Sequence, residues 1–269
     1  MRLGRRCAAG MVLAGLIVAG LGACGGGGDD DDSSSDTTEE PTGTSAAEVD
    51  VTQFCQGFTA VDKAFFGLPQ DPSALDAFVE ANITPYIEPT IANAPPELAD
   101  GVQVMFDALQ QALADSDFSA FGAPDYVAAQ TEVYPQLAEV CDLGSLDAVA
   151  IDYAFEGIPA TVPAGTTIVT LDNQTTAGEF HELTIARVND GVTETAEQIL
   201  ALPEDEATAR VMLQASASAE AGEIGGATIN LVPGRYIYAC FVPMGSIGAQ
   251  QGTGEPHYTA GMFGEFTVA

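Results

Sequence analysis

The sequence predicts an α+β chain with two folded parts, a small N-terminal helical bundle and a C-terminal all-β Greek-key sandwich that carries a helical insertion. Apolar residues recur every three or four positions in residues 49–146, which is the period of an amphipathic helix. In residues 147–269 they mostly alternate with polar residues, which is the period of a half-buried strand. Residues 1–48 show neither pattern, so we expect no folded domain there.

Residues 1–23 are typical of a bacterial signal peptide. Three arginines lie within the first six positions, and the apolar stretch that follows is short for a membrane span. The stretch ends in Leu-Gly-Ala-Cys24, which resembles a bacterial lipobox. That resemblance implies cleavage before Cys24 and a lipid on its thiol, and hence an extracytoplasmic protein that is lipid-anchored to the bacterial cell membrane. The alternative is an ordinary signal peptide with a chance cysteine.

Residues 24–48 are Gly-, Asp- and Ser-rich and contain no large apolar side chain, so we expect an acidic disordered tether. The chain after Cys24 has 39 acidic residues but only four of the seven basic ones. Such a charge repels nucleic acid and anionic lipid, and it favours a cationic partner protein or a bound cation. A surface made acidic for solubility is an equally simple explanation.

Three cysteines remain once Cys7 leaves with the signal and Cys24 carries lipid. Outside the cytoplasm an odd number leaves one thiol unpaired. Cys55 and Cys141 lie at the two ends of the helical segment and form the natural disulfide. Cys240 is then the free thiol.

Four apolar stripes at helical spacing predict four short helices joined by brief loops. Asp71 is placed to cap the second helix, and Pro85 and Pro89 are expected to break or kink its end. Gly144 is expected to end the fourth. The stripes begin at Phe54, Leu75, Leu98 and Val127. The bundle contains no histidine, and no chemistry is predicted for it.

Period-two patterns predict the strands of the sandwich. They cover residues 149–155, 168–171, 180–188, 229–232, 235–241 and 263–268. Val149 and Ile151 are expected on the half-buried face of the first strand. Residues 195–215 are interpreted as the helical insertion, and a polar Gly-rich loop is expected after it.

Four residues of the sandwich have the side chains of a type 1 (blue) copper site. Such a site uses two His, one Cys and a weak axial Met. The chain has only two histidines, His181 and His257, and both accompany Cys240 and Met262. Taken singly, each of the four is more simply a core or loop residue. Their joint occurrence, in this order, favours a metal site.

The segments PAGTTIVTLDNQ, FHELTI, GRYIYAC and PHYTAGMFGEFTV resemble the cupredoxin family, particularly plastocyanin-like domains, over residues 147–269. The resemblance implies a cupredoxin-like sandwich that holds one type 1 copper. Matched residue by residue, the imidazole ligands are His181 and His257, the thiolate is Cys240, and the axial thioether is Met262.

Two features depart from the family pattern. Sixteen residues, 241–256, separate Cys240 from His257, where plastocyanin-like proteins have only a few. Glu182 follows the first histidine, where the family usually has asparagine. The long loop also carries Met244, a second soft side chain that competes with Met262 for the axial position.

The sequence therefore predicts a membrane-anchored lipoprotein whose copper domain carries out one-electron transfer or copper carriage, with a cationic redox protein as partner. We do not expect an enzyme, because the chain has no nucleophile–base pair and too few histidines for a multicopper cluster. The alternative is a metal-free cupredoxin-like module that binds a partner at the cell envelope. The colour of the purified protein after copper is added distinguishes the two.

Overall fold

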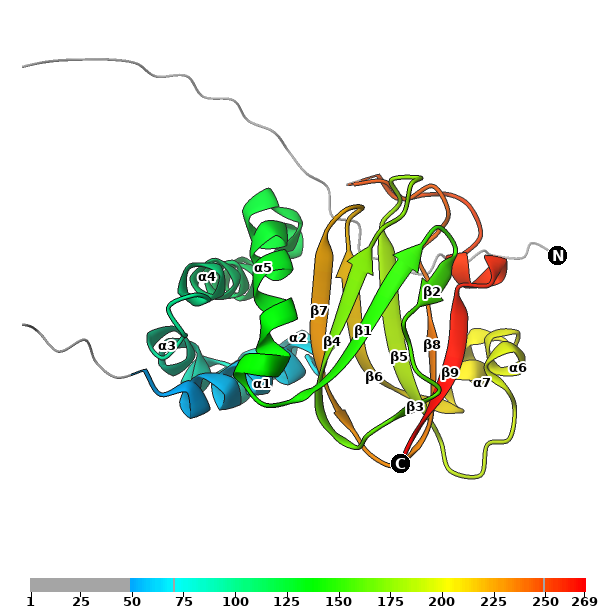
Figure 1. Cartoon of the computed structure of the whole chain (residues 1–269), viewed down its shortest axis with the longest axis horizontal. Coiled ribbons are helices and arrows are strands. Elements are labelled where there is room, and N and C mark those ends of the chain that lie inside the picture. Colours follow the sequence, from blue (N-terminus) through cyan, green and yellow to red (C-terminus); the bar gives the residue numbers. More distant parts are fainter. Residues whose placement is uncertain (1–48, 70, 249) are drawn as a thin grey trace, which may run out of the picture.

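The computed structural model describes residues 49–269 apart from residues 70 and 249. The expected signal peptide (1–23), the tether (24–48) and the lipid site at Cys24 lie outside the described residues. Within them, helices come first and a two-sheet β-sandwich follows, as the sequence predicts (Figure 1).

The helical part contains five α-helices and one 3-10 helix among the described residues, where four helices were expected. They are α1 (Val51–Phe66), α2 (Pro72–Asn82), α3 (Thr84–Ala92), α4 (Ala99–Asp115), η1 (Phe118–Gly122) and α5 (Pro124–Val140). The expected second helix divides at Ile83 into α2 and α3. The break expected near Pro85 therefore occurs, but Pro85 itself lies in the first turn of α3, where proline is well tolerated, and Pro89 lies inside α3. The fourth expected helix ends at Val140, and Gly144 begins the first strand.

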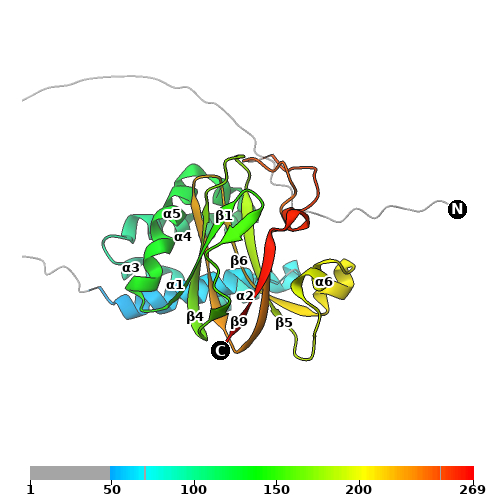
Figure 2. The same ribbon diagram turned by 45° about the vertical axis from the view of Figure 1, so that its right-hand side comes forward.

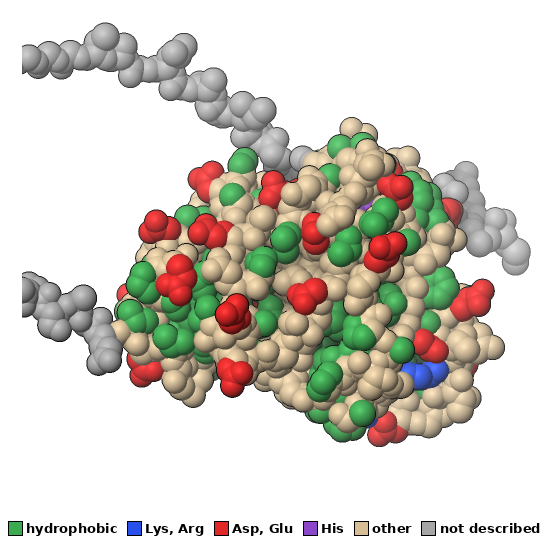
Figure 3. Space-filling view, in the orientation of Figure 1, with side chains coloured by type: hydrophobic (Ala, Val, Ile, Leu, Met, Phe, Trp, Pro, Cys, Tyr) green, Lys and Arg blue, Asp and Glu red, His purple; other side chains and the backbone are tan. Residues whose placement is uncertain are grey.

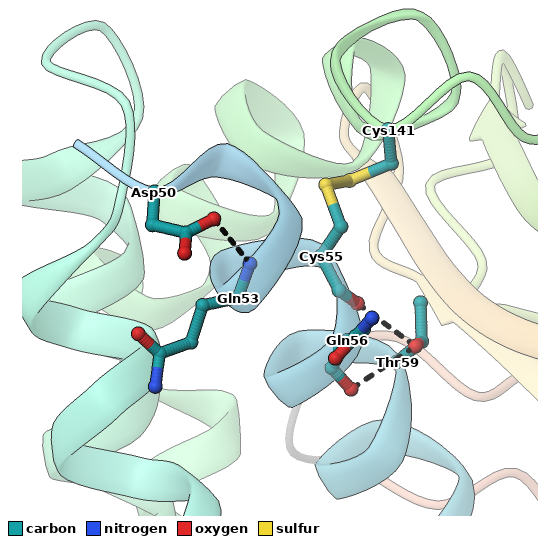
Figure 4. Close-up of a disulfide and its surroundings, with 6 residues drawn as sticks. All are labelled: Asp50, Gln53, Cys55, Gln56, Thr59 and Cys141. Carbon is teal, nitrogen blue, oxygen red and sulfur yellow. Dashed lines mark hydrogen bonds between the residues drawn. A yellow bond between two sulfur atoms is a disulfide. The ribbon is translucent and has the colours of Figure 1, made fainter.

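Helix α1 shows why the bundle forms where it does. The Asp50 side chain accepts a hydrogen bond from the Gln53 N–H, which caps the first turn. The predicted stripe is buried at Phe54, Phe58 and Val61. The expected Cys55–Cys141 disulfide is present and ties α1 to the end of α5 (Figure 4).

The sandwich consists of two mixed sheets. One has the strand order β2-β1-β4-β7 and the other β3-β9-β8-β5-β6. The pairs β1–β4 and β3–β9 are parallel, whereas the expected Greek key consists of antiparallel strands. The bounds are β1 (Gly144–Ile151), β2 (Ala154–Glu156), β3 (Thr161–Val162), β4 (Gly165–Asn173), β5 (His181–Val188), β6 (Val211–Ala219), β7 (Ile224–Leu231), β8 (Gly234–Ala239) and β9 (Phe263–Val268).

Three predictions for the sandwich are wrong in detail. Only α6 (Ala196–Leu200) and α7 (Glu204–Thr208) of the expected helical insertion are helical, and its last residues, 211–215, belong to β6. The expected Gly-rich loop is largely the end of β6 and the start of β7. In β1 the buried face is Leu146, Ala148 and Ala150, not the face of the larger Val149 and Ile151. Small side chains point inward there, where β1 contributes to the core between the sheets.

The bundle covers β7, which is the last strand of its sheet. Thr131 of α5 bonds through its hydroxyl to both the N–H and the C=O of Ile224. The Asp62 carboxylate of α1 accepts from the Thr228 N–H and from the Tyr134 hydroxyl. Unpaired edge groups are a liability in a β-sheet, and the helices satisfy several of them here. In both ribbon views the bundle lies beyond β7 and β4, and α6 lies on the opposite side of the sandwich (Figures 1 and 2).

Acidic side chains far outnumber basic ones in the sequence, and they are scattered over the face that Figure 3 shows. The three arginines of the sandwich each lie against a carboxylate, in the pairs Arg187–Asp190, Arg210–Glu194 and Arg235–Glu265. None of the helices in the described part of the chain is both long and apolar enough to cross a bilayer.

Candidate metal centre

The four predicted ligands come from three places in the sandwich. His181 is the first residue of β5, and Cys240 directly follows β8. His257 begins the 3-10 helix η2 (His257–Ala260), and Met262 lies between η2 and β9. All four are fully enclosed, with no exposed side-chain surface.

The structure brings the donor atoms of three of them together. His257 Nδ1 lies 3.1 Å from His181 Nδ1 and 3.3 Å from Cys240 Sγ, and the sulfur lies 4.0 Å from His181 Nδ1. They form a buried group of potential metal ligands among the described residues. The point equidistant from three atoms at these separations lies about 2.0 Å from each, against metal–nitrogen bonds of about 2.0–2.1 Å and metal–thiolate bonds of about 2.3 Å. The side chains therefore fit a single metal ion.

The long loop closes at its base, so its length does not separate Cys240 from His257. The His257 N–H donates to the Val242 C=O, and the Tyr258 N–H donates to the Cys240 C=O. Pro243 and Pro256 then form a bridge, and the remaining residues run out and back between them. The additional residues form a side hairpin, and the two ligands stay adjacent.

Met262 is held by backbone hydrogen bonds to Cys240 and His257. Its C=O accepts from the Cys240 N–H, and its N–H donates to the His257 C=O. Its side chain belongs to the same buried core as Cys240. Met244, the competing thioether, has backbone hydrogen bonds to Glu255 and Gly254 within the hairpin and is not part of that core.

Burial keeps the centre uncharged before a metal enters. Desolvation and, to a smaller extent, the neighbouring His257 lower the pKa of His181 to about 4. Desolvation also lowers the pKa of His257, against the pull of a nearby carboxylate. The pKa of the Cys240 thiol is raised to about 11, chiefly by burial, although the Glu182 N–H donates to its sulfur at 3.4 Å. Both imidazoles are therefore neutral at neutral pH, as metal ligands must be.

One residue at the centre, Glu179, was not predicted from the sequence. Its Oε2 lies 2.6 Å from His257 Nε2, on the side of the ring away from the donor cluster, although the oxygen is off the best line for an N–H donor. Its Oε1 accepts from the Tyr153 hydroxyl and the Gly245 N–H. These partners are remote in sequence, so no local spacing pointed to Glu179. In the other histidine, His181, the Nε2 atom is buried without a hydrogen-bond partner in the described structure.

Neither a protein-family model nor a curated protein matches the chain. Solved structures that are similar to it include auracyanin B, with 24% identity over 47% of this chain and 88% of that chain, at a TM-score of 0.31. Auracyanin A, a "blue" copper protein from the green thermophilic photosynthetic bacterium Chloroflexus aurantiacus, has 20% identity over 46% and 98%, at 0.30. Rusticyanin from Thiobacillus ferrooxidans has 22% identity over 46% and 77%, at 0.29. Because these TM-scores are low, we infer the nature of the site from its own side chains alone.

Proposed function

We propose that residues 147–269 are a cupredoxin domain that binds one copper ion at a type 1 site and passes single electrons. The observation that carries the proposal is the convergence of two imidazole nitrogens and one thiol sulfur, fully buried, around one point at bonding distance. Two nitrogens and a sulfur are the donor set of blue-copper sites, and a nearby thioether completes it.

Each side chain has a separate role in this proposal. His181 and His257 offer the Nδ1 lone pair of a neutral ring, and Cys240 offers a thiolate once its proton leaves. Met262 supplies the weak axial contact, which its place in the Cys240 core favours over Met244. When bound, copper supplies the one-electron couple that the side chains lack. Burial excludes water and a substrate, so we expect electron exchange and not catalysis.

We propose that the domain works outside the cytoplasm, tethered through a lipid on Cys24 to the bacterial cell membrane. The Cys55–Cys141 disulfide supports an oxidising compartment. The redox partner is a cationic protein, because the chain carries a formal charge of −32 and the sandwich arginines already lie against carboxylates. Loss of the protein from the membrane fraction after Cys24→Ala tests the anchor.

Electron transfer and copper carriage are distinguished by what happens on reduction. The protein is loaded with copper(II), reduced, and challenged with a copper(I) chelator. An electron-transfer centre keeps its ion through repeated cycles and gives a reversible one-electron titration. Loss of copper to the chelator in the first reduction would instead indicate carriage, and failure to bind copper would leave the metal-free module.

A further inference from the structure

The buried carboxylate of Glu179 has a role that the donor set alone does not explain. The residue is 7% exposed, and a carboxylate is seldom enclosed to this degree without a specific set of partners. Its partners come from three separate segments, at Tyr153, Gly245 and His257. Of these, only His257 belongs to the donor cluster.

The contact with His257 bears on which ring nitrogen carries the lone pair. Nδ1 faces Cys240 and His181, while Nε2 faces the Glu179 carboxylate. A neutral imidazole has a proton on only one nitrogen. A carboxylate beside Nε2 favours the proton there and leaves the Nδ1 lone pair directed at the donor cluster. Carboxylates in this position also make the ring a stronger ligand.

Glu179 also holds the side hairpin. Its Oε1 accepts from the Gly245 N–H at 3.1 Å, while the Phe180 N–H donates to the Ser246 C=O at 2.9 Å. These two bonds attach the hairpin to the segment that leads directly into His181. One side chain therefore contacts both the ring of His257 and the loop that precedes it.

We propose that Glu179 is a positioning residue of the metal centre, which selects the Nε2–H form of His257 and locks the long ligand loop in place. The proposal rests on the copper function proposed above. It accounts for a sixteen-residue ligand loop that still presents a fixed imidazole. Glu179 does not itself ligate, because its carboxylate lies at the outer nitrogen of the ring.

Glu179→Gln is the decisive variant, compared with two controls. Glutamine keeps the shape but has one oxygen and one NH₂ group, so it cannot accept from both the loop and the ring. Glu255→Gln removes an exposed negative charge two residues from His257 and controls for charge alone. Tyr153→Phe removes one hydrogen bond to Glu179 Oε1 and keeps the ring beside His257, so it controls for a purely structural loss.

The first readout needs no copper. Nitrogen-15 NMR of the two histidine rings in the full, metal-free chain should place the proton of His257 on Nε2 in the wild type and in both controls. Glu179→Gln should shift it toward Nδ1. Thermal unfolding verifies that each variant is folded, and the wild-type spectrum alone is decisive if Glu179→Gln does not fold. A wild-type His257 protonated on Nδ1 would overturn the proposal.

The second readout uses copper(II) and the full chain. Loss of an outer-shell partner typically costs about 10- to 100-fold in metal affinity, and we expect that loss for Glu179→Gln but less than about twofold for Glu255→Gln. With copper(I) affinity unchanged, the potential would rise by about 59 mV for each tenfold loss. Equal affinities in Glu179→Gln and the controls would refute a positioning role. If the wild type binds no copper, the proposed function fails, while the NMR result still tests whether Glu179 sets the protonated nitrogen of His257.

Discussion

At the centre, the two histidines owe their neutrality to burial, and the same burial keeps the Cys240 thiol protonated. Three donors are thus gathered without a net charge in the metal-free protein. Entry of a metal ion then displaces one proton, from the thiol, and the histidines need no deprotonation near neutral pH. The arrangement is pre-formed, so little ordering is needed when the ion binds.

The two methionines near the centre give a matched pair of variants. Met262→Leu should keep copper bound and raise the potential, because the axial contact is weak and acts mainly on the electronics of the site. Met244→Leu should change neither property, since Met244 lies in the hairpin outside the Cys240 core. Spectroelectrochemical titration of both variants measures the effect. A shift with Met244→Leu and none with Met262→Leu would reverse the assignment.

The grouping of His181, Cys240 and His257 could be anticipated from the sequence, because two histidines and one free cysteine stand out by residue type. Glu179 was not predictable. It is one of 39 acidic residues, and only the fold brings Tyr153 and Gly245 to it. Residue type makes candidate donors visible in a sequence, whereas the side chains around them are identified only from the fold.

At the scale of the elements, β6 shows how pairing overrides local preference. Residues 211–215 contain Met, Leu, Gln and Ala, which favour helices, and the sequence analysis extended the insertion through them. In the structure this segment pairs with β5, with one register shift at Gln214, and Ala215, Ala217 and Ala219 alternate inward. Strand preference depends on such neighbours, which are not visible in the local sequence.

The hairpin of residues 241–256 was also beyond local prediction. Sixteen residues separate Cys240 from His257 in the sequence, but the bonds at the base of the hairpin keep the two adjacent. Those bonds join Val242 to His257, across fourteen intervening residues. Lengthening a loop costs only about 0.6 kcal/mol per doubling, so such an insertion is tolerated.

The packing of α5 on β7 depends on a glycine. A Cβ added at Gly226 would lie 2.2 Å from the Tyr134 ring. Gly226→Ala should therefore lower the free energy of unfolding by about 1–3 kcal/mol, as overpacking does. Gly122→Ala, where nothing lies within 4 Å of the new Cβ, should change it by less than about 0.5 kcal/mol. Urea denaturation measures both, and equal stability would contradict the close packing.

At the scale of the whole molecule, helices and sandwich share a partly buried carboxyl at Asp62. Desolvation raises its pKa above the usual 3.8, despite hydrogen bonds from Thr228 and Tyr134. The contribution of this group to stability is therefore full below about pH 3.8 and is lost as pH rises through the raised pKa. Thermal unfolding across pH 4–8 should show the wild type losing stability relative to Asp62→Asn as pH rises. A constant difference between the two would contradict the shift.

The disulfide stabilises the helical part by closing a chain loop with a sequence separation of 86. Under the loop-entropy account its removal costs about 4 kcal/mol. Cys55→Ala with Cys141→Ala should lower the midpoint of denaturation while leaving the copper site intact, because the bridge and the donor cluster belong to different cores. Mass spectrometry of non-reduced peptides should find this pair and leave Cys240 unlinked. A bridge to Cys240 would contradict both assignments.

The most direct test of the central claim is the visible spectrum of the full chain with copper(II), measured beside Cys240→Ser. The wild type should bind one copper ion per chain and develop the intense band of a copper–thiolate bond. Cys240→Ser should fold normally and show no such band, because a hydroxyl cannot replace the soft thiolate. A colourless wild type, or a band that survives in Cys240→Ser, would contradict a type 1 copper centre at His181, Cys240 and His257.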